Sequence, residues 1–306
     1  RLYRDSIDTP PDSPRREPFS ILRFAAIWQL ANLRPGDWRR KEVGGNILSS
    51  TVEKLITCGV DEAERCATLP DNEFMMVVDR AVGVFADSFN LMAQRASLHI
   101  ISDEKPQAAS LLRKATMLAP GKFFLWSRLA ELTDSATQTR LHVALLYKAL
   151  LAPGPEQFKG KIRLSLATAL AGHGAATHAL RELELIEQLY TANGWHLSPS
   201  FRRLRESIPP ETKSEDPTPL YRRLEPLADE YLYSELPAVE AVKTYHKPPC
   251  RGRNGTPAPA AWRVTASDGN HYWFQPHRFS LAADLPSGTR LTIRICAGKV
   301  VAAQLR

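Results

Sequence analysis

A spacing that recurs every 34 residues constrains the fold of this chain more than any other feature of its sequence. Mostly small or apolar residues stand at relative positions 0, 4 and 7 of each copy, and the first two copies end in Pro or Gly at position 12. The copies comprise Ala108, Leu112, Ala115 and Pro120; His142, Leu146, Ala149 and Gly154; and Ala176, Leu180 and Leu183. Small residues let antiparallel helices approach closely, and stacked pairs bury a core that no single pair could bury. We therefore predict a stack of helix pairs.

This spacing resembles that of the tetratricopeptide repeat. In that family a proline such as Pro120 follows the second helix of a repeat, and Trp126 with Leu129 and Ala130 would open the next one. One period before the first copy the sequence has Phe74, so the earlier helices are expected to be divergent repeats. The alternative is an irregular helical bundle with accidental spacing.

Helix-like spacing of apolar residues extends over the first two hundred residues. The expected helices lie near 19–34, 45–58, 71–99, 105–119, 122–132, 135–151, 157–171, 175–192 and 199–207. No alternating strand is recognised before residue 238. The Pro-rich, charged residues 1–17 are expected to form a disordered lead-in.

After residue 238 the apolar pattern changes to a period of two, which is typical of strands. The expected strands are 238–246, 260–267, 270–276, 289–297 and 299–305. Five short strands over about 70 residues fit a small closed barrel of the OB type. The predicted fold is mainly α: a tetratricopeptide-like helical solenoid at 18–207, a linker at 208–226, and a five-stranded OB-type β barrel at 227–306.

The positive charge of the chain is concentrated in this last module. The whole chain has a net charge of +7, whereas the residues after 240 contain ten Lys and Arg against Asp268 and Asp284, a net charge of +8. Positive charge confined to one small domain is typical of proteins that contact phosphates. The alternative is that these charges only solvate the surface.

The stretch SDGNHYWFQPHRFSLAADLPSGTRLTIRI, residues 267–295, resembles the cold-shock type of OB fold. It contains a DG turn, an aromatic strand, a His followed by Phe and Ser, a Gly turn and a final alternating strand. In that family the aromatic strand and its neighbour stack the bases of single-stranded nucleic acid. The sequence departs from the family on the preceding strand, where AWRVTA replaces the expected Gly-Phe-Gly-Phe run.

The period of two also predicts which side chains of the barrel face outward. Val264, Leu291 and Ile293 are expected inside, Lys243 and Tyr245 are expected to share one face, and Trp262 is compatible with either face. The candidate nucleic-acid-binding residues combine aromatic rings with cations, the two parts that a single-strand binder needs. They are Lys243, Tyr245, Trp262, Arg263, His271, Trp273, His277, Arg278 and Arg294.

As a whole, the chain resembles components of the TOTE conflict systems of prokaryotes. The stretches that carry this resemblance are FKGKIRLSLATALAGHGAATHALRELE (158–184), GW (194–195) and LADEYLYSELPAVEAVKTYH (227–246). The resemblance implies a nucleic-acid-recognising component of defence against mobile elements, which works beside enzymatic partners and lacks catalysis of its own.

The sequence offers no recognisable catalytic, cofactor or metal motif. The four cysteines are too scattered for a disulfide framework or a zinc site, and His173 and His178 flank a Gly-rich turn that is typical of a helix connector. We expect no enzyme activity, no cofactor and no metal. No apolar run is long enough to span a bilayer and no leader follows Arg1, so we expect a cytoplasmic protein or a piece of a longer chain.

These features together predict that the barrel binds single-stranded nucleic acid, RNA rather than DNA, while the helical repeats bind a protein partner. One alternative is a protein-interaction scaffold in which Trp273 and the arginines form the interface between the barrel and the helices. Another is the regulatory part of a larger enzyme.

Overall fold

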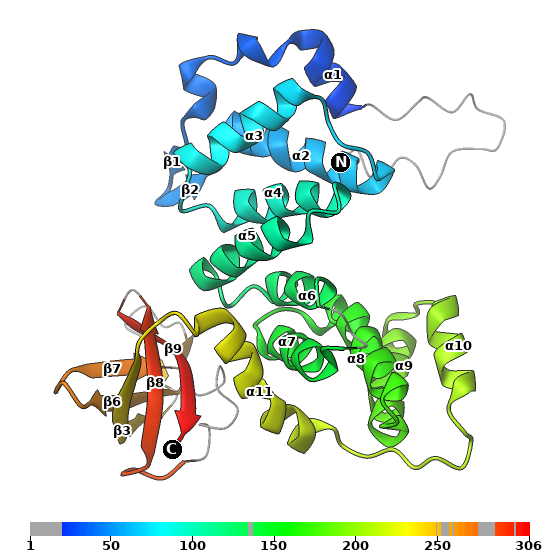
Figure 1. Ribbon diagram of the computed structural model, residues 1–306, viewed down its shortest axis with the longest axis vertical. Coiled ribbons are helices and arrows are strands. Elements are labelled where there is room, and N and C mark those ends of the chain that lie inside the picture. Colours follow the sequence, from blue (N-terminus) through cyan, green and yellow to red (C-terminus); the bar gives the residue numbers. More distant parts are fainter. Residues whose placement is uncertain are drawn as a thin grey trace. The chain divides into compact units, whose positions relative to one another are not determined.

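The computed structural model describes residues 20–133, 137–248, 250–251, 257–258, 260–274, 285–296 and 298–306 (Figure 1). The described chain is mainly helical, as predicted, and a sheet follows the helices. It divides into two compact units, residues 1–104 and 105–306. The linker predicted at 208–226 lies within the second of these units, and the separation of a helical and a β domain there stays a prediction.

The first unit is built from helices and one short hairpin among its described residues. The elements are α1 (Ile21–Trp28), η1 (Leu30–Asn32), η2 (Pro35–Trp38), β1 (Lys41–Val43), β2 (Asn46–Leu48), α2 (Thr51–Cys66), α3 (Asn72–Val84) and α4 (Phe89–Ile101). The hairpin was not predicted, because all six of its strand residues are exposed and leave no alternating pattern. The single helix expected at 71–99 is two helices, since the hydroxyl of Ser88 caps α4 by accepting from the backbone N–H of Leu91.

The helices of the first unit pack around α2. Val52, Ile56, Val60 and Ala63 form its buried stripe and meet the buried residues of the neighbouring helices. A glycine, Gly59, lies on the same helix directly against the aromatic ring of Phe74 on α3. A Cβ at residue 59 would stand 2.4 Å from Cζ of that ring, so the close approach of the two helices depends on the missing side chain.

The second unit begins with a stack of helices joined by short connections. The helices are α5 (Lys105–Leu118), α6 (Phe123–Glu131), α7 (Thr139–Leu151), α8 (Gly160–Gly172), α9 (Ala176–Asn193), α10 (Pro199–Ser207) and α11 (Thr218–Tyr233), with the short η3 (Glu156–Phe158) before α8. Consecutive helices from α5 to α9 pack against one another (Figure 1). None of the helices in the described residues of the chain is both long enough and apolar enough to span a bilayer.

The residues of the 34-residue spacing form the contacts between these helices. Seven of them are buried: Ala108, Leu112, Ala115, Leu146, Ala149, Leu180 and Leu183. Pro120 follows the end of α5, and its carbonyl accepts a hydrogen bond of 2.8 Å from the indole N–H of Trp126 on α6. The predicted stack of helix pairs is therefore present between α5 and α9.

Helix α11 covers residues 218–226 of the segment 208–226 that was predicted as a linker. Pro219 stands in its first turn, where a missing N–H is tolerated, but Pro226 lies inside the helix. Burial of Tyr221, Leu224 and Leu232 against the stack stabilises the helix despite this proline. A segment rich in proline and charge is thus helical because tertiary packing overrides local propensity.

A buried ionic cluster joins α11 to α7. Nζ of Lys148 on α7 lies 2.8 Å from Oε1 of Glu225 and 2.9 Å from Oδ1 of Asp229, both on α11. All three side chains are buried. Burial raises the pKa of Asp229 to about 6, although the nearby ammonium opposes this shift. Burial alone would lower the pKa of Lys148, but the two carboxylates raise it.

The β module is a single sheet of five antiparallel strands in the order β7, β6, β3, β8, β9 (Figure 1). The strands are β3 (Ala238–Lys247), β6 (Ala261–Ala266), β7 (His271–Phe274), β8 (Arg290–Cys296) and β9 (Lys299–Leu305), and a small ladder joins β4 (Cys250–Arg251) to β5 (Pro257–Ala258). The edge strands β7 and β9 contact each other, but no ladder pairs them within the described residues. The strands match the prediction, whereas the closed barrel expected at 227–306 is instead a sheet that is not closed.

We expect Gly59→Ala to destabilise the protein by roughly 1–3 kcal/mol, because the new methyl group would overlap a buried ring. Gly83→Ala on α3 is the matched control, since nothing lies within 4 Å of a Cβ there. It should be neutral or stabilise by up to about 1 kcal/mol. Urea denaturation followed by circular dichroism measures both, and equal stabilities of the two variants would contradict the close helix contact.

The ionic cluster predicts a pH-dependent difference between the protein and its Asp229→Asn variant. The folded-state pKa of Asp229 is raised, so its contribution to stability is present below pH 3.8 and is lost as the pH rises through about 6. Relative to the variant, the protein should lose roughly 2 kcal/mol of unfolding free energy between about pH 4 and about pH 7. Urea denaturation of both proteins across this range measures the difference, and parallel curves would contradict the assignment.

Candidate nucleic-acid interface

A bulge in β3 decides which of its side chains face outward. Lys243 pairs with Val264 on β6, but the next pair joins Tyr245 to Arg263, so Thr244 is an extra residue. The extra residue interrupts the alternation of the strand. Lys243 is consequently 5% exposed and Tyr245 47% exposed. The prediction that these two side chains share one face is therefore wrong.

Two of the candidate residues belong to the interior of the module. Nζ of Lys243 lies 3.2 Å from the ring centroid of Trp262 and donates a hydrogen bond to the carbonyl of Leu285. Trp262 is itself only 2% exposed. A buried ammonium requires such partners, because a charge taken out of water is otherwise strongly unfavourable. Lys243 was expected on the exterior and is found inside, and Trp262 takes the inner of its two expected orientations.

Three other candidates come together on the outer side of β3, β6 and β7. Arg263 on β6 pairs with Tyr245 on one neighbouring strand and with Trp273 on the other. The two aromatic rings meet edge to face at 6.0 Å, and Cζ of Arg263 lies 5.7 Å from the centroid of the tyrosine ring. Tyr245 and Trp273 are each nearly half exposed. We call these three residues the outer aromatic surface.

Polar side chains of the same strands surround the arginine. Nε of Arg263 donates to the hydroxyl of Thr244 at 3.4 Å, and the hydroxyl of Thr265 donates to the same oxygen at 3.3 Å. Nδ1 of His271 lies 3.0 Å from the hydroxyl of Thr265, which places this predicted residue at the rim of the outer aromatic surface. The two threonines were not predicted to contribute, because an outward threonine is ordinary in any strand.

The remaining candidates lie elsewhere. Arg294 on β8 has Nη2 2.9 Å from Oε2 of Glu230 on α11, and its Nη1 donates to the carbonyls of Ser234 and Leu236. It fastens the sheet to the end of α11 instead of joining the outer aromatic surface. His277 and Arg278 lie outside the described residues.

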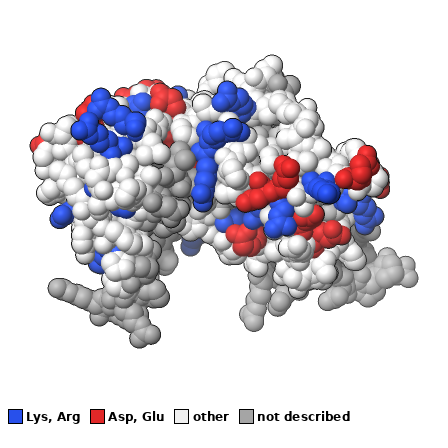
Figure 2. Space-filling model, turned by 90° about the horizontal axis from the view of Figure 1, so that it is seen from below, with Lys and Arg blue, Asp and Glu red and all other residues white. Residues whose placement is uncertain are grey.

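On the face of the molecule in Figure 2, Lys and Arg stand at several separate places among uncharged and acidic residues. Arg306 is paired with Glu240 at 2.5 Å. Lys247, Arg290 and Lys299 have no ion-pair partner among the described residues. Within the described part of the module, these three side chains and Arg263 are the cations that an incoming anion can contact.

The histidines of the Gly-rich turn make ordinary connector contacts. Nε2 of His173 is hydrogen-bonded to the hydroxyl of Thr139, and Nδ1 of His178 lies 3.3 Å from the carbonyl of Glu215. The described parts of the chain contain no group of three or more His, Cys, Asp or Glu side chains that could hold a metal ion.

Comparison with known proteins gives a family match and a similar solved structure. Residues 91–228 match a family model described as a domain of unknown function, DUF7017, so the match ends within α11 and before the β module. The crystal structure of MamA is similar with 16% sequence identity and a TM-score of 0.43, covering 56% of this chain and 88% of that chain. No curated protein matches.

We expect Lys243→Met to destabilise the protein by about 1–2 kcal/mol, because it keeps the apolar stem but removes the contact with the indole ring and the hydrogen bond to Leu285. Lys247→Met on the same strand is exposed and should change the unfolding free energy by less than about 0.5 kcal/mol. Chemical denaturation measures both variants. Because Lys243 points inward, Lys243→Met should lower the unfolding free energy more than Lys247→Met does. A larger loss for Lys247→Met would refute the inward orientation of Lys243.

Proposed function

We propose that this protein binds single-stranded nucleic acid through the outer aromatic surface of its β module. The observation that supports this most directly is the exposed pair of Tyr245 and Trp273 with Arg263 between their strands. Aromatic side chains of this kind stack bases, at about 1–3 kcal/mol per base, and an adjacent arginine contacts either the base or the phosphate.

The charge of the module supports the same proposal. A net charge of +8 after residue 240 attracts a polyanion over a distance, and three further cations without ion-pair partners in the described structure can contact phosphates near the strands. Such contacts release counterions, so the affinity should fall as the salt concentration rises. RNA is the ligand that we propose in preference to DNA.

The helical stack of the second unit is proposed to bind a protein partner. Its 34-residue spacing and its buried small residues resemble the tetratricopeptide repeat, whose stacked pairs offer extended surfaces to other proteins. Together with the resemblance to TOTE conflict systems, this suggests a non-catalytic component that recognises nucleic acid beside enzymatic partners in defence against mobile elements.

A second candidate function is that of a protein-interaction scaffold without nucleic-acid binding. The contact of Arg294 with Glu230 favours it, because an arginine of the β module there serves the interface with the helices. The scaffold hypothesis also requires Trp273 to lie at the interface with the helices. Trp273 is instead 48% exposed, and its ring contacts the ring of Tyr245. The open position of this aromatic pair favours the first proposal.

The test is fluorescence anisotropy of labelled oligo-U and oligo-dT of about 15 nucleotides with the full chain. Trp273→Ala and Tyr245→Ala should each weaken binding roughly 5- to 150-fold, as expected for loss of one stacked base. Leu305→Ala on β9 is the matched control, since it truncates a side chain of similar exposure, 49%, on a strand that pairs with β8 and not with the strands of the outer aromatic surface in the described structure. It should leave the affinity unchanged.

Salt dependence is the second readout. The affinity of the unmodified chain should fall steeply between about 50 and about 200 mM salt, and Arg263→Gln should make this fall less steep. An affinity that does not change with the salt concentration, or that is unchanged when both aromatic rings are removed, would refute the proposal. Absence of binding to either oligonucleotide would favour the scaffold.

A further inference from the structure

A hollow of about 510 Å³ lies on the outer side of the sheet, where β3 stands between β6 and β8. The residues that line it and face outward are Glu240, Val242, Thr244, Thr265, Ser267, Arg290 and Arg306. We call this set of residues the outer hollow. The sequence did not indicate it, because three strands and the ends of two others contribute single residues that are ordinary on a solvated face.

The outer hollow continues the outer aromatic surface across the sheet. Arg263 and Thr265 face the same side of β6 two residues apart, so their cross-strand rows are about 7 Å apart. The row of Thr265 runs through Val242 on β3 to Arg290 on β8. Two strand spacings along this row put the backbone of Arg290 roughly 12 Å from that of Arg263. A bound single strand, which contacts about 4–16 nucleotides of an OB-type module, covers this distance.

Threonine hydroxyls connect the two surfaces. The hydroxyl of Thr244 accepts from Nε of Arg263 at 3.4 Å and from the hydroxyl of Thr265 at 3.3 Å. Both threonines also line the outer hollow. Hydroxyl groups of this kind contact phosphate and sugar oxygens in nucleic-acid complexes without reading the base. The border between the two surfaces is therefore suited to the backbone of a strand.

The charged groups of the outer hollow leave one positive charge uncompensated. Nη1 of Arg306 lies 2.5 Å from Oε1 of Glu240, so these two side chains neutralise each other. Arg290 is exposed and has no ion-pair partner among the described residues. A guanidinium matches the geometry of a phosphate group through two parallel N–H···O hydrogen bonds. The charge of the hollow thus favours a phosphate.

We propose that the outer hollow binds the sugar-phosphate backbone of the single strand whose bases stack on the outer aromatic surface, with one phosphate held by Arg290. This inference rests on the proposed function and adds the path of the strand to it. From the aromatic pair the backbone passes the hydroxyls of Thr244 and Thr265 and reaches β8. The hollow contributes affinity without base preference, because it contacts only the backbone.

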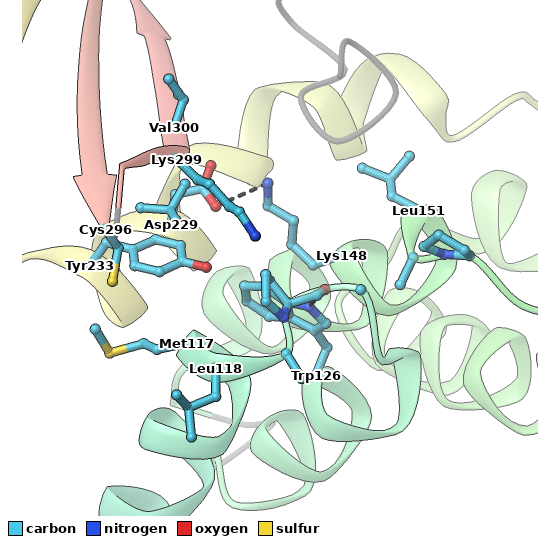
Figure 3. A pocket seen from close by; sticks show the side chains of 16 residues that line it. Met117, Leu118, Trp126, Lys148, Leu151, Asp229, Tyr233, Cys296, Lys299 and Val300 are labelled. Carbon is cyan, nitrogen blue, oxygen red and sulfur yellow. Dashed lines mark hydrogen bonds and ion pairs between the residues drawn. The ribbon is translucent and has the colours of Figure 1, made fainter. Parts of the chain in front are cut away.

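Lys299 is a matched cation outside the outer hollow. It is also exposed and without an ion-pair partner in the described structure, but it lies at the cavity that Lys148 and Asp229 line between the sheet and the helices (Figure 3). Arg290 begins β8, and Lys299 pairs with Cys296 at the end of that strand. The two cations are therefore about 20 Å apart along the strand.

The first experiment compares Arg290→Gln with Lys299→Gln in the anisotropy titration of oligo-U of about 15 nucleotides with the full chain. Arg290→Gln should weaken binding about fivefold at about 100 mM salt and lower the slope of log affinity against log salt by about 0.7, as expected for one lost phosphate contact. Lys299→Gln removes the same charge and should weaken binding less than about twofold. Equal losses in the two variants, or no loss in Arg290→Gln, would overturn the inference.

The second experiment adds a charge to the outer hollow. Val242 is 37% exposed, so Val242→Lys can place an ammonium in the hollow and should tighten binding about fivefold. Val43→Lys makes the same substitution at an exposed strand residue of the first unit and should tighten binding less than about twofold. A gain in affinity cannot come from a variant that fails to fold. Equal gains at the two residues would contradict a phosphate contact in the hollow.

The aromatic variants separate this inference from the proposed function. If oligo-U binds and Trp273→Ala weakens binding while Arg290→Gln does not, the proposed function stands and the outer hollow is not part of the site. If the unmodified chain binds neither oligo-U nor oligo-dT, both are refuted.

Discussion

The buried contact of Lys148 with Glu225 and Asp229 is the interaction on which the arrangement of the second unit depends. It joins α11 to the helical stack, and removal of one partner from such a cluster typically costs about 3–5 kcal/mol because an uncompensated charge stays buried. Helix α11 in turn contacts β9 and is tied to β8 through Arg294 and Glu230. The lysine on α7 thus helps to hold α11, and through α11 the sheet, beside the helices.

Local sequence patterns predicted those parts of the fold that local physics determines. The 34-residue spacing located the helices from α5 to α9 because small residues are needed wherever helix axes approach closely. The change to a period of two located the five strands. Helix α11 escaped prediction because its prolines favour a linker, and only burial against α7 stabilises it. Closure of the barrel was an inference from strand number, and strand number alone does not determine whether the last two edges pair.

The alternation of side chains along the strands predicted only part of the candidate site. The alternation of β6 correctly placed Val264 inside and Arg263 outside. On β3 the alternation predicted the wrong face for Lys243, because the bulge is formed by a threonine and no sequence pattern distinguishes it from a regular strand residue. The partner of Arg294 lies 64 residues away in the chain and that of Lys148 lies 77 residues away, and contacts at such separations follow from tertiary packing and not from spacing.

The bulge at Thr244 also affects how related chains should be aligned. It adds one residue to the outer side of β3, so both Thr244 and Tyr245 face outward while Lys243 and Val264 stay paired inside. An alignment gap at Thr244 would restore regular pairing and keep both faces. A gap of one residue elsewhere in β3 would exchange the faces on one side of it, and the tyrosine would lie inside where the exchanged side includes residue 245. The position of a single alignment gap in this strand would therefore distinguish relatives that keep the outer aromatic surface from relatives that have lost it.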